Sequence, residues 1–152
     1  MTGNEYANLI ARYVARRFGA REVKVYREVP LGKTIIGKNR QIDILVVNTA
    51  TNNAFAIECK FQESQGTADE KIPYAMTDLG AIPMHGCIAY AGAGFSAGVL
   101  QMLRSSELAA YCLPDAATLE SGAATIELDQ MLAIAFGWWD VLLRNKRPVE
   151  AE

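Results

Sequence analysis

Hydrophobic and polar positions repeat along the chain with two different periods, and each period predicts one type of element. From Asn4 to Phe18 the apolar side chains recur every three or four residues, which predicts an amphipathic helix that ends at Gly19. From Glu22 to Val29 polar and apolar residues alternate strictly, which predicts a half-exposed strand. Two more apolar runs, Ile42–Val47 and Phe55–Phe61, predict strands joined by the polar reversal NTATNN.

The second half of the chain predicts helices and strands in turn. Thr67 and Glu70 have the spacing of a capping box, so a helix is expected over Thr67–Ala81, and Pro73 either delays its start or distorts it. The remaining predicted elements are a strand buried on both faces over residues 85–92, a helix near Ser96–Ser105, a short strand over Ala109–Leu113, and a final helix over Thr125–Leu143 that is apolar nearly all round.

Three charged residues interrupt the two central apolar runs. Asp43 lies in the first run, and Glu58 and Lys60 lie in the second, where the alternation places both on the face opposite to Ile57 and Cys59. Charged groups are rarely buried without a partner, so the arrangement requires either a mutual ion-pair network or a site that uses the charges. Two carboxylates suit a hard divalent cation, and a nearby ammonium can hold or deprotonate a water molecule. The pattern therefore indicates phosphodiester hydrolysis.

In these residues the chain resembles the PD-(D/E)XK nuclease superfamily, whose motif is an acid at one strand end followed, after a hairpin, by an acid-any-Lys triplet on the next strand. Here the motif is Asp43 with Glu58-Cys59-Lys60, and the residue before the first acid is Ile rather than Pro. The stretch from Gln62 to Tyr74 is also similar to the segment after the catalytic strand in restriction-like and phage-type members. The resemblance implies an α/β fold with a restriction-endonuclease-like core. That core is a mixed central β-sheet flanked by helices, in the order αβββαβ, followed by a C-terminal strand and helix.

The same resemblance implies roles for individual residues. Asp43 and Glu58 would hold Mg²⁺, for which Mn²⁺ would substitute, with the backbone carbonyl of Cys59 as a further ligand. Lys60 would orient or activate the attacking water. Glu5 has two interpretations: its carboxylate stabilises the positive end of the first helix, or it adds a metal ligand, as in members such as junction resolvases.

Basic and polar side chains around these strands are candidates for contacts with nucleic acid. The first helix carries arginines on its polar face, and the segment Pro30–Asn39 contains two glycines and two lysines, which predicts a hairpin loop able to approach a phosphate backbone closely. Each of these groups can equally be an ordinary solvated surface. The candidate contacts are Arg12, Arg16, Lys33, Lys38, Arg40, Gln62 and Lys71.

Composition limits these interpretations. The chain has 152 residues, 51% of them hydrophobic, which predicts one domain over residues 1–152 with a full core. The formal net charge of −2 excludes binding of nucleic acid through overall positive charge, so a local basic surface is required. Cys59, Cys87 and Cys112 lack zinc-site spacing and read as buried free thiols, and neither a signal peptide nor a membrane span is found. We therefore expect a cytoplasmic protein with no membrane partner.

Together these features predict a Mg²⁺-dependent DNA endonuclease of the restriction, homing or junction-resolving type. The alternative is a module on the same fold that binds DNA or protein without cleaving. A homodimer or larger symmetric oligomer is expected, because one metal site cuts one strand and the apolar final helix offers a surface for association.

Overall fold

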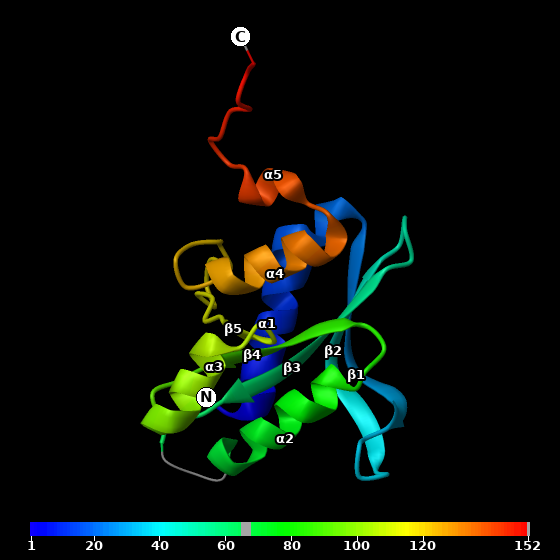
Figure 1. Cartoon of the computed structure of the whole chain (residues 1–152), viewed down its shortest axis with the longest axis vertical. Coiled ribbons are helices and arrows are strands. Elements are labelled where there is room, and N and C mark those ends of the chain that lie inside the picture. The colour runs from blue at the N-terminus through cyan, green and yellow to red at the C-terminus, as the bar shows by residue number, and fades with distance from the viewer. Residues whose placement is uncertain (65–67, 152) are drawn as a thin grey trace.

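The computed structural model describes residues 1–64 and 68–151, and its centre is a mixed β-sheet (Figure 1). The strands of this part of the chain are β1 (Val23–Lys33), β2 (Asn39–Asn48), β3 (Ala54–Phe61), β4 (His85–Ala91) and β5 (Ala109–Tyr111). They form one sheet in the order β1-β2-β3-β4-β5. The first three strands pair antiparallel, and β4 and β5 join β3 in parallel. This is the predicted mixed sheet, with the two motif strands at its centre.

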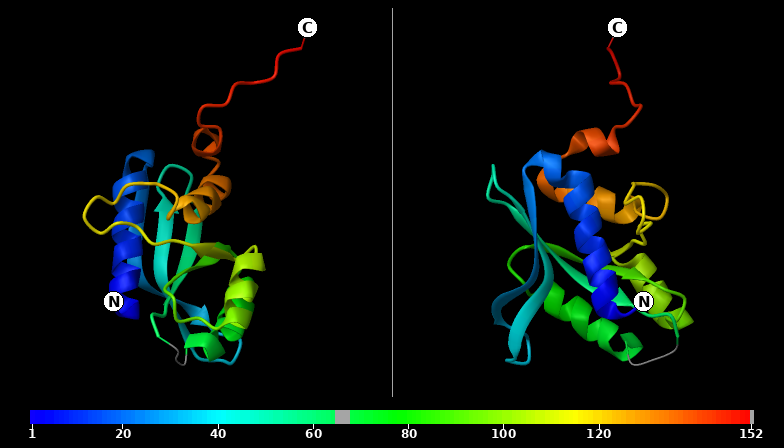
Figure 2. Two further views of the ribbon diagram at one scale, coloured as in Figure 1. Left: turned by 90° about the vertical axis from the view of Figure 1, so that its left-hand side faces the viewer. Right: turned by 180° about the vertical axis from the view of Figure 1, so that it is seen from behind.

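Helices cover both faces of the sheet. The helices are α1 (Gly3–Phe18), the 3₁₀ helix η1 (Gly19–Arg21), α2 (Ala68–Gly80), α3 (Ala97–Ser105), α4 (Ile126–Phe136) and α5 (Trp139–Leu142). The buried residues form two clusters: α1 and α4 pack against one face and make the α1–α4 core, and α2 and α3 pack against the other and make the α2–α3 core. Figure 2 shows α1 on one side of the sheet and α2 with α3 on the other.

The alternation of β3 decides where its charges go. Phe55, Ile57 and Cys59 are buried in the α1–α4 core, as predicted. Glu58 and Lys60 therefore lie on the side of the sheet that α2 covers. One strand thus contributes both to the hydrophobic core and to a polar site.

The first helix begins with a capping box, in agreement with the expected first turn. The Thr2 hydroxyl accepts a hydrogen bond from the Glu5 amide (3.1 Å), and the Thr2 amide donates to the Glu5 carboxylate (2.7 Å). Two backbone donors that the helix leaves unpaired are satisfied in this way.

The hairpin between β1 and β2 is longer than the sequence suggested. The predicted hairpin loop over Pro30–Asn39 is too long at both ends, because β1 continues to Lys33 and β2 begins at Asn39, with a shift of register between Pro30 and Lys33. Proline is tolerated here because β1 is an edge strand, and one missing amide donor costs no ladder hydrogen bond on the open side. The turn is thereby reduced to residues 34–38, where the Thr34 amide donates to the Lys38 carbonyl (2.7 Å).

The predicted final helix over Thr125–Leu143 is two helices. Gly137 has a positive φ of 75° and ends α4, since glycine adopts the left-handed conformation without steric cost. Trp138 then turns back into the core, where its ring lies 5.1 Å from Phe18 and 5.0 Å from Phe136 between centroids.

In the predicted helix over Thr67–Ala81, α2 continues through Pro73 from Ala68 to Gly80. The proposed cap at Thr67 lies outside the described residues. Within the described part of the chain, the three cysteines are buried and free, as expected. No helix there is both long and apolar enough to cross a membrane.

Candidate active site

The two motif acids meet where the β2–β3 ladder stops. The last regular pair on this side is Ile44 with Ile57. At the next position the Cys59 amide donates to the Asp43 carboxylate instead of to a backbone carbonyl (2.8 Å). The Asp43 amide in turn donates to the Glu58 carboxylate (3.3 Å). Side-chain hydrogen bonds thus replace the ladder, and the opening between the strands contains both acids.

The path of β2 changes at the same residue. Ile44 packs in the α1–α4 core, whereas Ile42, two positions earlier, packs in the α2–α3 core. In a regular strand both side chains would share one face, so the backbone turns over at Asp43. The irregularity directs this carboxylate toward β3 rather than into either core.

Arg27 on β1 holds the other side of Asp43. Its Nε donates to the Asp43 carbonyl (3.0 Å), and its two terminal nitrogens donate to the side-chain oxygens of Asn8 and, at 3.2 Å, Asn4. The neighbouring Glu28 has a positive φ of 55°, so β1 is irregular opposite Asp43 as well. One guanidinium therefore ties the first turns of α1 to the motif strand.

The surroundings of Glu58 perturb its carboxyl group. Burial, and then the nearby charge of Asp43, raise the pKa of Glu58 to about 8, although Lys60 acts in the opposite direction. Glu58 therefore keeps its proton at neutral pH when no cation is bound. A divalent cation held by Asp43 and Glu58 would favour the ionised form of both carboxylates.

A cavity of about 220 Å³ opens over the catalytic strand, between the β1–β2 hairpin and α2. Glu58 and Lys60 line it together, in agreement with their common face on β3. The other lining residues come from the hairpin and from α2: Thr34, Asn39, Arg40, Gln41, Lys71, Tyr74, Ala75 and Asp78. The acid-any-Lys triplet thus faces a space that a phosphate-containing ligand could enter.

Among the predicted contacts with nucleic acid, Lys71 lines this cavity and Lys33 and Lys38 are exposed on the hairpin, where Lys33 donates to Asn39. Arg40 is not available to nucleic acid, because its guanidinium pairs with Asp78 (2.9 and 3.1 Å) and the two side chains are only 10% and 14% exposed. Arg40 therefore fastens the hairpin to α2. Its partner was not singled out from the sequence, since an aspartate on a helix carries no distinguishing pattern.

Gln62 is buried, which argues against the predicted direct contact with nucleic acid. Its side-chain amide donates to the Gly94 carbonyl (2.9 Å), and its Oε1 has no partner among the described residues. A Cβ at Gly92 would lie 2.2 Å from the Gln62 carbonyl oxygen, and one at Gly94 would lie 2.5 Å from the Ser64 carbonyl oxygen. The turn after β4 therefore packs directly on the chain that leaves the catalytic strand.

The remaining predicted residues lie on α1. The Glu5 carboxylate is engaged in the capping box, and Arg12 and Arg16 are exposed without lining the cavity. Among the described residues no group of three or more His, Cys, Asp or Glu side chains is placed to hold a metal ion, so Glu5 does not join Asp43 and Glu58. Two carboxylates nevertheless fit Mg²⁺, which keeps several waters and takes one or two protein carboxylates with substrate phosphate.

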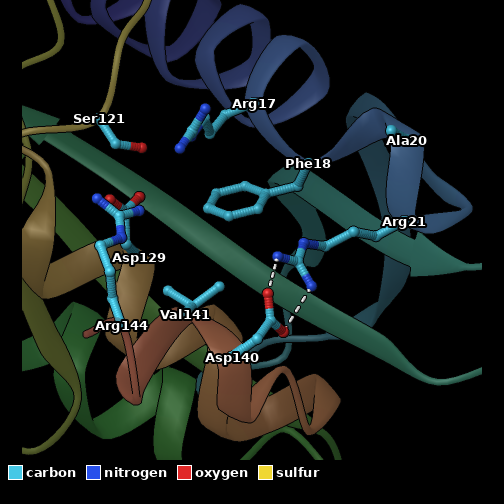
Figure 3. A pocket seen from close by; sticks show the side chains of 9 residues that line it. All are labelled: Arg17, Phe18, Ala20, Arg21, Ser121, Asp129, Asp140, Val141 and Arg144. Atoms are coloured by element: carbon cyan, nitrogen blue, oxygen red, sulfur yellow. Dashed lines mark hydrogen bonds and ion pairs between the residues drawn. The ribbon is translucent and has the colours of Figure 1, made fainter. Parts of the chain in front are cut away.

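A second cavity, of about 450 Å³, lies between the end of α1 and α5 (Figure 3). Its buried acid, Asp129, accepts hydrogen bonds from Tyr13 (2.6 Å) and Thr125 (3.0 Å). Arg21 makes a bidentate pair with Asp140 (3.0 and 2.6 Å). Because these acids already have donors, this polar network holds α4 against α1 and α5 against η1.

The sequence matches the family profile of the PD-(D/E)XK nuclease superfamily domain over residues 2–139. Two solved structures show partial similarity to this chain: a protein of unknown function, AF1548 (14% identity, 64% of this chain and 53% of that chain, TM-score 0.41), and a repair endonuclease from Pyrococcus abyssi (13% identity, 65% and 42%, TM-score 0.32). This chain thus spans about half the length of either structure. No curated protein matches it significantly. The family match covers most of the chain, including both motif strands, and the chain belongs to the PD-(D/E)XK nuclease superfamily.

Proposed function

We propose that residues 1–152 act as one nuclease domain that hydrolyses phosphodiester bonds of DNA with Mg²⁺ as cofactor. The observation that carries the proposal is the opening of the β2–β3 ladder, where Asp43 and Glu58 approach one another while Lys60 lines the same cavity as Glu58. Like charges at a buried position are costly unless a cation or a proton neutralises them. A divalent cation meets that need, and it is the family's usual cofactor.

Asp43 and Glu58 would hold the cation, with the Cys59 carbonyl as a third protein ligand. When bound, the cation supplies counter-charge and Lewis acidity for an anionic transition state. Lys60, which lines the cavity beside Glu58, would hold a water molecule near the scissile phosphate and stabilise the charge that develops on it. Arg27 keeps the Asp43 backbone in position, and Lys71 across the cavity is available to a neighbouring phosphate.

We also infer that two copies act together. A double-strand break or a resolved junction requires two sites, which a two-fold axis supplies most simply. Part of the final apolar segment is already covered, since Trp138 is buried. Ile134 and Trp139 remain 61% and 54% exposed, and such side chains are favoured anchors between subunits.

Cleavage of supercoiled plasmid, linear duplex and a four-way junction, each with Mg²⁺, Mn²⁺ or EDTA, tests the proposal. We expect metal-dependent cleavage that Asp43→Ala, Glu58→Ala and Lys60→Ala each abolish while the variants stay folded. Lys24→Ala, on the exposed face of β1, is the matched control and should cleave normally. Binding without cleavage under every metal condition would replace the nuclease by the non-cleaving module. A motif variant with wild-type activity would remove that residue from the catalytic set.

A further inference from the structure

The tip of the β1–β2 hairpin exposes two adjacent branched apolar side chains. Ile35 is 46% exposed and Ile36 is 61% exposed. Thr34 and Lys38 close the turn around them through a backbone hydrogen bond, and Gly37 supplies the positive φ of 80° that the reversal needs. Isolated exposed isoleucines are common, but two adjacent ones at a hairpin tip form an apolar point, and DNA-binding proteins insert isoleucine among other apolar side chains between base steps.

The tip is held firmly rather than left free. The Ile35 amide donates to an Asp78 oxygen (3.0 Å), and Arg40 pairs with the same carboxylate. The Arg40 hydrogen bond lowers the pKa of Asp78, so this contact stays ionised across the neutral range. Because the hairpin is fastened to α2 through its turn and through β2, the isoleucines have a fixed position relative to α2.

The tip and the catalytic residues border the same cavity. Thr34, which precedes the isoleucines, lines it together with Glu58 and Lys60. Tyr74, on the α2 wall, is 38% exposed and adds an aromatic ring to the same space. The isoleucines themselves do not line the cavity, but they directly follow Thr34 in the chain, so a polymer whose phosphate occupies the cavity has the tip beside it.

The charges around the tip favour a polyanion over a second protein. Lys33 and Lys38 flank the isoleucines, and Lys71 stands across the cavity. Asp78, which accepts the hydrogen bond from the turn, is already paired with Arg40. Although the net charge of the chain is −2, the lysines form a local cationic rim around the two isoleucines. Such a rim is complementary to the phosphates of DNA, and the apolar side chains are complementary to its bases.

We propose that Ile35 and Ile36 enter a base step beside the scissile phosphate, and that the protein prefers DNA in which this step is unpaired or poorly stacked. Aliphatic side chains cannot read base edges by hydrogen bonding, so their contribution comes from replacing a stacking contact. Unstacking is easiest at a bulge, a mismatch or a branch. The substrate class is therefore distorted or branched DNA, and this inference rests on the proposed nuclease function.

Binding is measured first, with the Lys60→Ala protein in EDTA, so that it does not depend on cleavage. The probes are a continuous duplex and the same duplex with a two-nucleotide bulge, each carrying 2-aminopurine at the disturbed step. We expect roughly tenfold tighter binding to the bulged duplex and a rise of fluorescence as the base unstacks. The double variant Ile35→Ser/Ile36→Ser should lose both effects and keep its affinity for the continuous duplex within about threefold.

Ile126→Ser is the matched control, because Ile126 is also half exposed (50%) but lines a different cavity. It should keep the preference, and the single variant Ile36→Ser should lose most of it. Equal binding of both duplexes by the parent protein, or an unchanged preference in the double variant, would overturn the wedge. So would a dimer that the double variant disrupts in the absence of DNA, since the tip would then be a protein interface. A wild-type protein that prefers the bulge but never cleaves would contradict the nuclease and leave the wedge supported.

Discussion

Replacement of Glu58 by glutamine should stabilise the metal-free protein, and increasingly so as the pH rises. Burial and the neighbouring Asp43 raise the pKa of Glu58 from 4.5 to about 8 in the folded protein. A group whose pKa is raised by folding contributes stability that is present below its unfolded pKa and is lost as the pH rises through its folded pKa. The wild-type protein should therefore lose stability between about pH 4.5 and pH 8, whereas Glu58→Gln, which never ionises, should not.

The size of the effect follows from the same values. A tenfold change in acidity is worth about 1.4 kcal/mol, so this shift corresponds to about 4 kcal/mol between pH 5 and pH 9. Water entering the cavity screens part of the charge, and we expect about 2–3 kcal/mol to remain. For a chain of this length that is a difference in Tm of about 5–10 °C at pH 9 and much less at pH 5.

Thermal unfolding followed by circular dichroism in EDTA measures this difference. Glu107→Gln, at an exposed glutamate, is the control and should follow the wild type at every pH. Addition of Mg²⁺ should raise the Tm of the wild type at pH 9 and leave that of Glu58→Gln nearly unchanged, because only the ionised pair binds the cation well. Parallel pH profiles for wild type and Glu58→Gln, or a variant that is less stable at pH 9, would refute the reasoning and favour a structural ion pair with Lys60.

Three further predictions concern other parts of the molecule. Arg27→Gln should raise the Mg²⁺ concentration for half-maximal cleavage about tenfold or more, and kcat should recover at saturating Mg²⁺. Lys24→Gln, on the same strand, should leave this concentration unchanged. An unchanged metal requirement in Arg27→Gln would limit Arg27 to a structural role. Gly94→Ala should cost about 2 kcal/mol or more in urea unfolding, because its Cβ would lie 2.5 Å from the Ser64 carbonyl oxygen, whereas Gly98→Ala, with nothing within 4 Å, should be tolerated. Light scattering should give a mass above that of the 16.6 kDa monomer, and a monomer at micromolar concentration, unchanged by DNA, would contradict the paired action of two copies.

The elements around the motif could be predicted because each has a strong local pattern. The alternation on β3 placed Glu58 and Lys60 opposite the core, and this needed no knowledge of the rest of the fold. The end of the hairpin was harder, since Pro30 and Gly32 resemble a loop but lie in an edge strand whose partner lies beyond the turn. The break at Gly137 was also missed, because the apolar periodicity of the segment continues past this single residue with positive φ and reads as one helix.

The support of the site could not be predicted, because it depends on pairs that are distant in sequence. Arg27 contacts the carbonyl of Asp43 and the side chain of Asn8, and none of the three carries a local pattern that specifies the others. Arg40 was assigned to nucleic acid from its charge alone, and only the fold reveals that Asp78 takes up its guanidinium. Sequence patterns indicate on which face of a strand or helix a residue lies. The side chain that it contacts on that face depends on tertiary packing.

The contact between the chain after β3 and the turn after β4 determines which segments must accompany the motif for the site to form. The backbone amide of Gln62 donates to the Ala91 carbonyl (3.2 Å), and the backbone amide of Gly94 donates to the Gln62 carbonyl (2.7 Å). Residues of the turn after β4 therefore fix the direction of the backbone beyond Lys60. The acid-any-Lys triplet therefore cannot be transferred to another protein on its own. Grafting residues 43–60 onto another sheet would transfer the charges but not the surface that orients the chain leaving them. A designer who moves this chemistry must also move β4 with its following turn and keep both Gly92 and Gly94 without side chains.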